Sequence, residues 1–170
     1  MPGVEALKLG PGDQAFTPGT YARAMDRHRH RSTTLALAWS GLLPFFLAIP
    51  AGLGLLDPRL ETLLTGYTLA ILAFMCGTMW AESLARPGLS TQTVVLVSNA
   101  IVLLALASLY LTFAAAMLWM AGLFTLHLVA ELRFTRKPQP PWYRRMRAAI
   151  SVIVIFLLGM AGLLRLVTGA

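Results

Sequence analysis

Two side chains that could do chemistry inside a membrane, His127 and Glu131, stand four residues apart in an apolar part of the sequence. On a helix this spacing puts both on one face, one turn apart. An imidazole oriented by a carboxylate can relay protons, hold haem iron or contact a quinone. The structural alternative is a neutral histidine that hydrogen-bonds to another helix, with the glutamate in water at the membrane surface. The sequence leaves both open, and the pair is a candidate ligand or proton site.

A second candidate is the basic sequence RHRHR at residues 27–31. Its histidines, His28 and His30, lie about 200° apart around a helix, so both cannot face one metal ion. Neighbouring arginines would also repel a cation, and we predict no metal site. The net charge of +7 does not indicate nucleic-acid binding, because the basic residues flank apolar segments instead of forming a polar domain. They suit anionic lipid headgroups, and the anchors predicted here are Arg27, Arg29 and Arg31.

Both candidates belong to a chain that is far more apolar than a soluble domain. Hydrophobic residues make up 57% of the sequence and charged residues 12%, with a mean hydropathy of +0.69. About a quarter of the residues of a soluble domain are charged. The composition therefore predicts an integral membrane protein, whose spans must position the candidate residues.

Five apolar segments reach the length of about 20 residues that crosses a bilayer. The third and fourth come from an uncharged stretch between Arg86 and Glu131, which is too long for one helix and is predicted to turn near residues 108–111. We predict an all-α bundle of five transmembrane helices, at residues 35–56, 63–81, 91–107, a further stretch ending near 130, and 148–167.

The distribution of positive charge predicts the orientation of this bundle. With the N-terminus inside and the C-terminus outside, twelve of the fourteen Lys and Arg residues lie on the inner side, as the positive-inside rule requires. We predict two parts: an N-terminal tail with a basic interfacial helix at 1–32, and a transmembrane domain at 33–170. The last inner loop leads into aromatic and basic residues expected to anchor it among lipid headgroups: Trp142, Tyr143, Arg144 and Arg145.

Small residues in two of the spans predict close helix packing. Gly77 and Ala81 are spaced by four, and Gly159 and Gly162 by three, so each pair lets a neighbouring helix approach. The sequence contains no nucleotide-binding glycine motif, no paired intramembrane carboxylates and no recognisable protease dyad. We therefore do not expect an enzyme.

Three stretches together resemble a known family of membrane proteins. They are SGLLPFFLA at 40–48, GYTLAILAFMCGTMWA at 66–81 and ELRFTRKPQPPWYRRMR at 131–147. The sequence is similar over most of residues 35–165 to the domain of unknown function 3429 family, which includes mitochondrial transmembrane protein sixty-nine. The resemblance implies the inner membrane of bacteria, or of mitochondria in a eukaryote, and no established reaction. The family pattern has a histidine where this chain has Met79.

These observations favour a non-catalytic accessory subunit or assembly factor of a larger inner-membrane complex, for instance a respiratory one, with anionic lipid and other membrane subunits as partners. No cofactor is required by that interpretation. One alternative is an oligomeric channel or small-molecule carrier with a pathway lined by His127, Asn99, Thr112 and Thr125. Another is a redox subunit that binds haem or quinone through His127.

Overall fold

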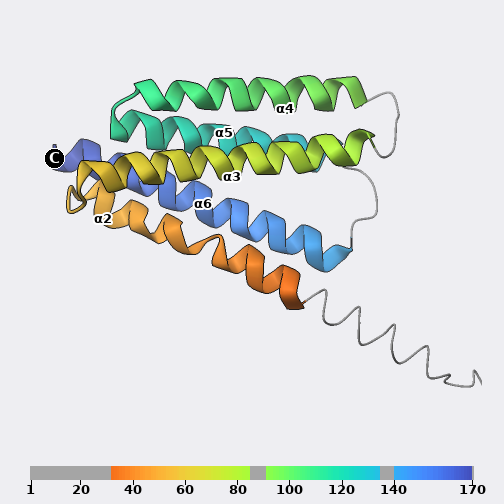
Figure 1. Cartoon of the computed structure of the whole chain (residues 1–170), viewed down its shortest axis with the longest axis horizontal. Coiled ribbons are helices and arrows are strands. Elements are labelled where there is room, and N and C mark those ends of the chain that lie inside the picture. The colour runs from red at the N-terminus through yellow and green to blue at the C-terminus, as the bar shows by residue number, and fades with distance from the viewer. Residues whose placement is uncertain (1–31, 85–90, 135–139, 170) are drawn as a thin grey trace, which may run out of the picture. The chain divides into compact units, whose positions relative to one another are not determined.

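A computed structural model of the chain describes residues 32–84, 91–134 and 140–169 (Figure 1). Contacts divide the chain into residues 1–38 and 39–170. Most of the predicted tail lies outside the described residues, as do its predicted lipid anchors Arg27, Arg29 and Arg31.

All regular structure in the described part of the chain is helical. A helix covers residues 32–40, and the elements after it are η1 (Leu43–Leu47), α2 (Ala48–Gly52), α3 (Pro58–Leu84), α4 (Thr91–Leu106), η2 (Ala107–Tyr110), α5 (Phe113–Phe134) and α6 (Pro141–Thr168). By length and composition, five described segments could cross a membrane: Ser32–Gly52, Pro58–Leu84, Thr91–Tyr110, Phe113–Phe134 and Pro141–Thr168. The all-α class and the five spans are confirmed, while the orientation in the membrane stays a prediction.

The hairpin predicted in the uncharged stretch is also confirmed. The 3₁₀ helix η2 ends α4, and Leu111 is extended before α5 begins. The Trp119 indole ties the two helices together, since its Nε1 donates to the Leu104 carbonyl at 2.8 Å. Helix α6 begins at Pro141 with Pro140 as its N-cap. Proline suits the first turn of a helix, because the N–H it lacks would have no hydrogen-bond partner there.

The first span changes to 3₁₀ geometry in η1, whose first turn holds Pro44, a residue with no N–H to continue the helical hydrogen bonds. The nearby Gly41 carbonyl accepts a hydrogen bond from the Tyr67 hydroxyl of α3 at 2.6 Å. Phe45 is buried beside this break, and its ring lies 5.4 Å from Tyr67 and 6.3 Å from Phe124 of α5 between centroids. The interrupted segment is thereby fixed to two other helices.

Helix α5 packs against α6, α4 and α3, while α2 packs on α6 (Figure 1). Glycines permit the two closest approaches. A Cβ added to Gly52 of α2 would lie 2.6 Å from the carbonyl oxygen of Ala161 in α6, and one added to Gly162 would lie 2.6 Å from Cγ of Leu118 in α5. The largest fully buried side chains include Phe45, Phe124, Leu72, Ile101, Met117, Met120 and Leu158.

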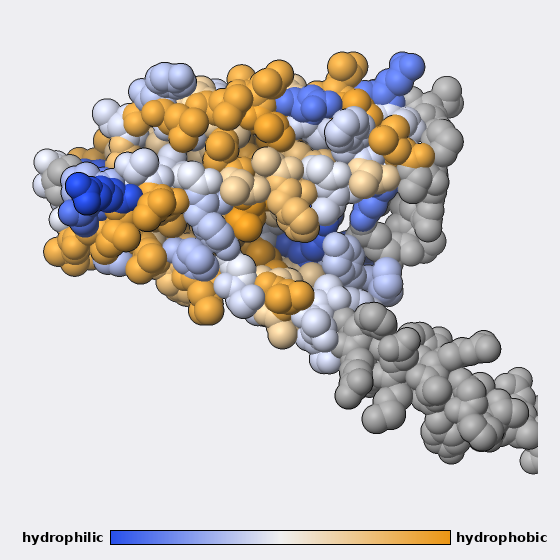
Figure 2. All heavy atoms as spheres, in the orientation of Figure 1, coloured by the Kyte–Doolittle hydropathy of each residue, from blue (hydrophilic) through white to orange (hydrophobic). Residues whose placement is uncertain are grey.

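Two ends of the helix bundle differ in charge. The basic end, where α5 ends and α6 begins, carries the exposed residues Arg133, Arg144 and Arg145. The turn end holds the α2–α3 loop and η2. Between them the visible surface is rich in hydrophobic side chains (Figure 2), among them Phe74, which is 69% exposed. Such a surface fits a lipid environment.

Candidate functional site

The buried face of α6 carries an arginine near each of its ends. Arg147 and Arg165 are eighteen residues apart, about 27 Å along a helix, which is close to the thickness of a bilayer core of about 30 Å. Charged side chains at such positions need partners, and each arginine pairs with a glutamate of a neighbouring helix. The buried residues between them on this face are Ser151, Val154, Leu158 and Ala161.

At the basic end, Arg147 connects α6 with α5 and α3. Its Nε lies 2.8 Å from Oε1 of Glu131. Its Nη1 donates to Oγ1 of Thr78 at 3.0 Å and approaches the hydroxyl of Tyr143 at 3.3 Å. The second terminal nitrogen, Nη2, is buried and makes no hydrogen bond to any described residue. A cation that is only 9% exposed thus keeps unused donor capacity.

One turn further from the basic end lie two more buried polar residues, His127 on α5 and Ser151 on α6. His127 is four residues before Glu131, and Ser151 is four residues after Arg147. Because α5 and α6 pack antiparallel and Glu131 pairs with Arg147, His127 and Ser151 lie at a similar depth. They are 0% and 1% exposed. Neither ring nitrogen of His127, nor Oγ of Ser151, makes a hydrogen bond within the described part of the chain.

Helix α3 closes the third side of this group of residues. The main chain of Met75 approaches the His127 ring without reaching hydrogen-bond geometry, and the Met75 carbonyl accepts a hydrogen bond from Oγ1 of Thr78 at 2.8 Å. Thr78 in turn accepts from Arg147, whose charge also acts on His127 and Cys76. We call His127, Glu131, Arg147, Ser151 and Thr78 the polar cluster.

The arginine at the turn end has a different environment. Nη2 of Arg165 lies 3.0 Å from Oε1 and 3.2 Å from Oε2 of Glu61 on α3. Its Nη1 donates to the Ala51 carbonyl of α2 at 3.2 Å, and its guanidinium lies 5.6 Å from the ring centre of Phe113 on α5. Arg165 therefore ties four elements together.

The structure places the predicted pair His127 and Glu131 in the polar cluster, but Glu131 forms its ion pair with Arg147. In the sequence Arg147 stands out only as one more basic residue of the inner loop. Met79, where the resemblance implied a histidine, is 3% exposed and packs with Val94 and Ala130.

The predicted packing residues divide into two groups. Gly162 is buried between α6 and α5, so its packing partner lies within the chain. Gly77 and Ala81 are exposed on α3, and a Cβ at Gly77 or Gly159 would meet nothing within 4 Å. Gly52, whose contact with α6 is as close as that of Gly162, is not among the predicted packing residues.

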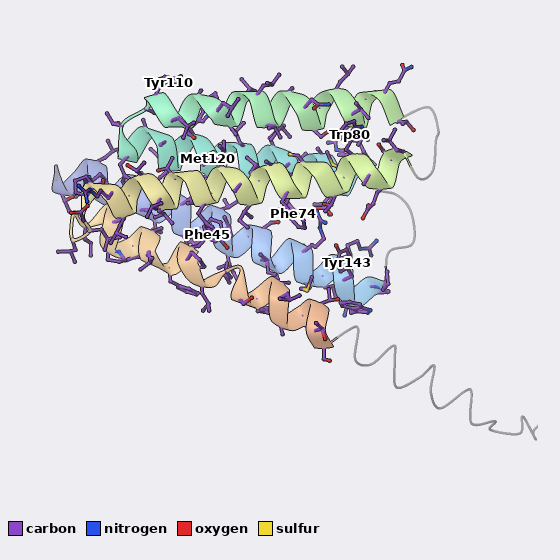
Figure 3. The ribbon with its side chains drawn as sticks, in the orientation of Figure 1. Phe45, Phe74, Trp80, Tyr110, Met120 and Tyr143 are labelled. Carbon is purple, nitrogen blue, oxygen red and sulfur yellow. The ribbon has the colours of Figure 1, made fainter. Side chains whose placement is uncertain are left out.

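The predicted headgroup anchors gather at the start of α6 (Figure 3, Tyr143). Arg144 and Arg145 are exposed, whereas Trp142 and Tyr143 are half-buried and stack edge to face at 5.7 Å. The guanidinium of Arg147 lies over the ring of Tyr143, 5.7 Å from the ring centre.

The residues suggested for a conducting pathway do not come together inside the chain. Asn99, Thr112 and Thr125 are exposed, and only His127 is buried. The Asn99 amide and the Thr125 hydroxyl both bond to carbonyls of their own helices.

Comparison with known families gives one match. Residues 30–163 match the model of the family described as "Protein of unknown function (DUF3429)". The chain belongs to the DUF3429 family. The resemblance noted over residues 35–165 is therefore confirmed. No curated protein and no solved structure matches the chain, so the role of this DUF3429 protein has to follow from its own residues.

A sequence signal for the two ion pairs does exist. Residues 147, 151, 154, 158, 161 and 165 recur at intervals of three and four, the pattern of one helix face. Both arginines therefore lie on the face that also carries Val154 and Leu158. This pattern indicates buried, paired arginines instead of headgroup contacts.

Proposed function

We propose that this DUF3429 protein is a non-catalytic accessory subunit or assembly factor in a larger inner-membrane complex. The observation that carries the proposal is a row of small residues along the outer side of α3, which we call the α3 small face: Gly66, Ala70, Gly77 and Ala81.

The α3 small face has no packing partner in the described part of the chain. A Cβ at Gly66 or Gly77 would meet nothing within 4 Å, and Ala70 and Ala81 are exposed. Glycine lowers helix stability by about 1 kcal/mol relative to alanine. The half-buried Gly66 and the exposed Gly77 therefore lower the stability of the helix without improving its packing inside the chain.

The shape of this face suits a transmembrane helix of a partner subunit. Small residues spaced by four leave a shallow groove in which another helix backbone can lie, whereas lipid tails gain little from such a surface. Phe74 and Trp80, which Figure 3 labels on α3, stand three residues before and after Gly77 and are 69% and 43% exposed. They give the partner large apolar side chains to pack against beside the groove.

The membrane and the orientation belong to the same proposal. The basic end, with exposed Arg144 and Arg145 beside Trp142, supports an inner face that contacts anionic headgroups. The N-terminus is then inside and the C-terminus outside, in a bacterial inner membrane or, in a eukaryote, the mitochondrial inner membrane.

Replacing Gly77 with leucine tests the proposal. The new isobutyl side chain would fill the groove, and we expect the co-extracted complex to fall about tenfold, equivalent to about 1.4 kcal/mol of association free energy. The measurement is the particle mass after extraction from the native membrane in mild detergent. Gly122→Leu on α5 is the matched control, because Gly122 is also exposed with nothing within 4 Å of its Cβ position.

An unmodified protein that runs as an isolated monomer contradicts the proposal. A homo-oligomer without other subunits also contradicts it and favours a channel or carrier. Equal losses in Gly77→Leu and Gly122→Leu would show that α3 is not the contact surface.

A further inference from the structure

Three polar groups of the polar cluster are buried with no hydrogen bond to the described residues: the imidazole of His127, Oγ of Ser151 and Nη2 of Arg147. Each such group costs about 1–3 kcal/mol when it is unsatisfied. A bilayer core provides no water to satisfy them from outside. Their occurrence together on α5 and α6 points to a state in which another molecule supplies the missing partners.

The donor and acceptor capacity of these groups defines that molecule. Arg147 Nη2 can only donate, Ser151 can donate its hydroxyl proton, and a neutral His127 donates from one ring nitrogen. Three donors at a similar depth on the packed helices α5 and α6 suit an oxygen that accepts hydrogen bonds. The charge of Arg147 is already balanced by Glu131, with Nε and Oε1 2.8 Å apart. An anionic ligand would add an unbalanced charge inside the membrane, which is costly, so a neutral carbonyl oxygen fits better.

The location of the cluster determines how such a molecule would reach it. Figure 2 shows a hollow below the part of α3 nearer the basic end, where α6 lies behind, with hydrophilic atoms on its floor. Towards the turn end the neighbouring buried side chains are apolar, including Phe124, Leu72 and Val154. Because His127 and Ser151 are 0% and 1% exposed, a membrane-dissolved molecule would have to displace neighbouring side chains to reach them from the side of α3 and α6. The site does not continue as a polar path across the bundle.

We propose that His127, Arg147 and Ser151 form a binding site for the carbonyl oxygen of a neutral, lipid-soluble quinone ring. Nη2 of Arg147 donates to this oxygen, while Nη1 keeps its bonds to Thr78 and Tyr143, at 3.0 and 3.3 Å. The ion pair with Glu131 is kept. This inference does not depend on the α3 small face, because none of its residues belongs to the polar cluster.

The experiment uses the full chain in nanodiscs of neutral phosphatidylcholine, titrated with decylubiquinone and followed by tryptophan fluorescence. We expect saturable quenching that Ser151→Ala weakens about fivefold to tenfold in Kd. His127→Leu should weaken it more than tenfold. Neither variant should lower the thermal stability, because each removes a polar group that has no hydrogen bond in the described chain. A merely structural role would lower stability and leave the affinity of the folded protein unchanged.

Ser108→Ala is the matched control, because Ser108 is equally buried but lies in η2 and bonds to the Ala105 carbonyl at 2.7 Å. It should leave the Kd unchanged. The proposal is overturned by quenching that does not saturate, by equal Kd values for Ser151→Ala and the unmodified chain, or by equal weakening in Ser108→Ala. A second titration in nanodiscs containing anionic phosphatidylglycerol tests whether a phospholipid headgroup competes for the same donors. Loss of quinone binding there would assign the site to a phospholipid and also overturn the proposal.

Discussion

The two ends of α6 use the same pair of residue types in different ways. At the turn end, Arg165 uses both terminal nitrogens, on Glu61 and on the Ala51 carbonyl. At the basic end, Arg147 pairs with Glu131 but leaves Nη2 without a partner among the described residues. An ion pair in which both terminal nitrogens of the arginine have partners holds helices together, whereas one with a spare terminal nitrogen can bind something else.

The neighbours of the two arginines also differ. Arg165 lies over the ring of Phe113, close to the tight contact between Gly52 and Ala161. Arg147 lies beside His127 and Ser151, whose polar atoms have no described hydrogen-bond partner. This difference supports a structural role at the turn end and the proposed binding role at the basic end.

The largest effect is expected from breaking the ion pair at the turn end. Arg165→Leu leaves Glu61, whose side chain is 12% exposed, as an unpaired carboxylate. Removing one partner of a buried pair costs about 3–5 kcal/mol. Equilibrium unfolding in mixed detergent should show this loss. Glu61→Leu in the same chain should restore most of the stability, and a double variant as unstable as Arg165→Leu alone would refute the structural role.

Much of the fold could be predicted because a membrane-spanning helix needs a long, uncharged, apolar segment, which can be read directly from the sequence. Apolar length located the five spans, and the excessive length of one uncharged stretch located the turn that became η2. Consecutive prolines located the start of α6. Each of these features depends on neighbours in the sequence.

The polar cluster could be predicted only in part, because it depends on which helices meet. His127 and Glu131 are close in sequence, and their spacing identified them. Arg147 joins Glu131 only because α5 and α6 are antiparallel at this register, and Arg165 reaches Glu61 across 104 positions. A count of charges for topology treats both arginines as membrane-flanking residues, and so it misses their pairing.

A smaller effect is expected from adding one methyl group to the close contact at the turn end. Gly52→Ala would put Cβ 2.6 Å from the Ala161 carbonyl oxygen, a backbone atom that cannot rotate away, and overpacking of this kind costs about 1–3 kcal/mol. Gly162→Ala should cost less, because its closest contact, at 2.6 Å, is with the Leu118 side chain, which can change rotamer, while the nearest backbone atom, the Ala114 carbonyl oxygen, is 3.0 Å away. Thermal unfolding should rank the two, with Gly159→Ala as a control that meets nothing within 4 Å. Equal losses in all three would show that the turn end is not tightly packed.

The smallest expected effect comes from removing one buried serine hydroxyl at each end of the bundle. Ser108 at the turn end donates to the Ala105 carbonyl, so Ser108→Ala should lower the free energy of unfolding by up to about 1 kcal/mol. Ser151 at the basic end has no described hydrogen bond, so Ser151→Ala in the ligand-free protein should leave stability unchanged or slightly higher. Both residues are 1% exposed, which makes burial equal in the comparison. If Ser151→Ala destabilised the ligand-free chain as much as Ser108→Ala, the Ser151 hydroxyl would already have a partner.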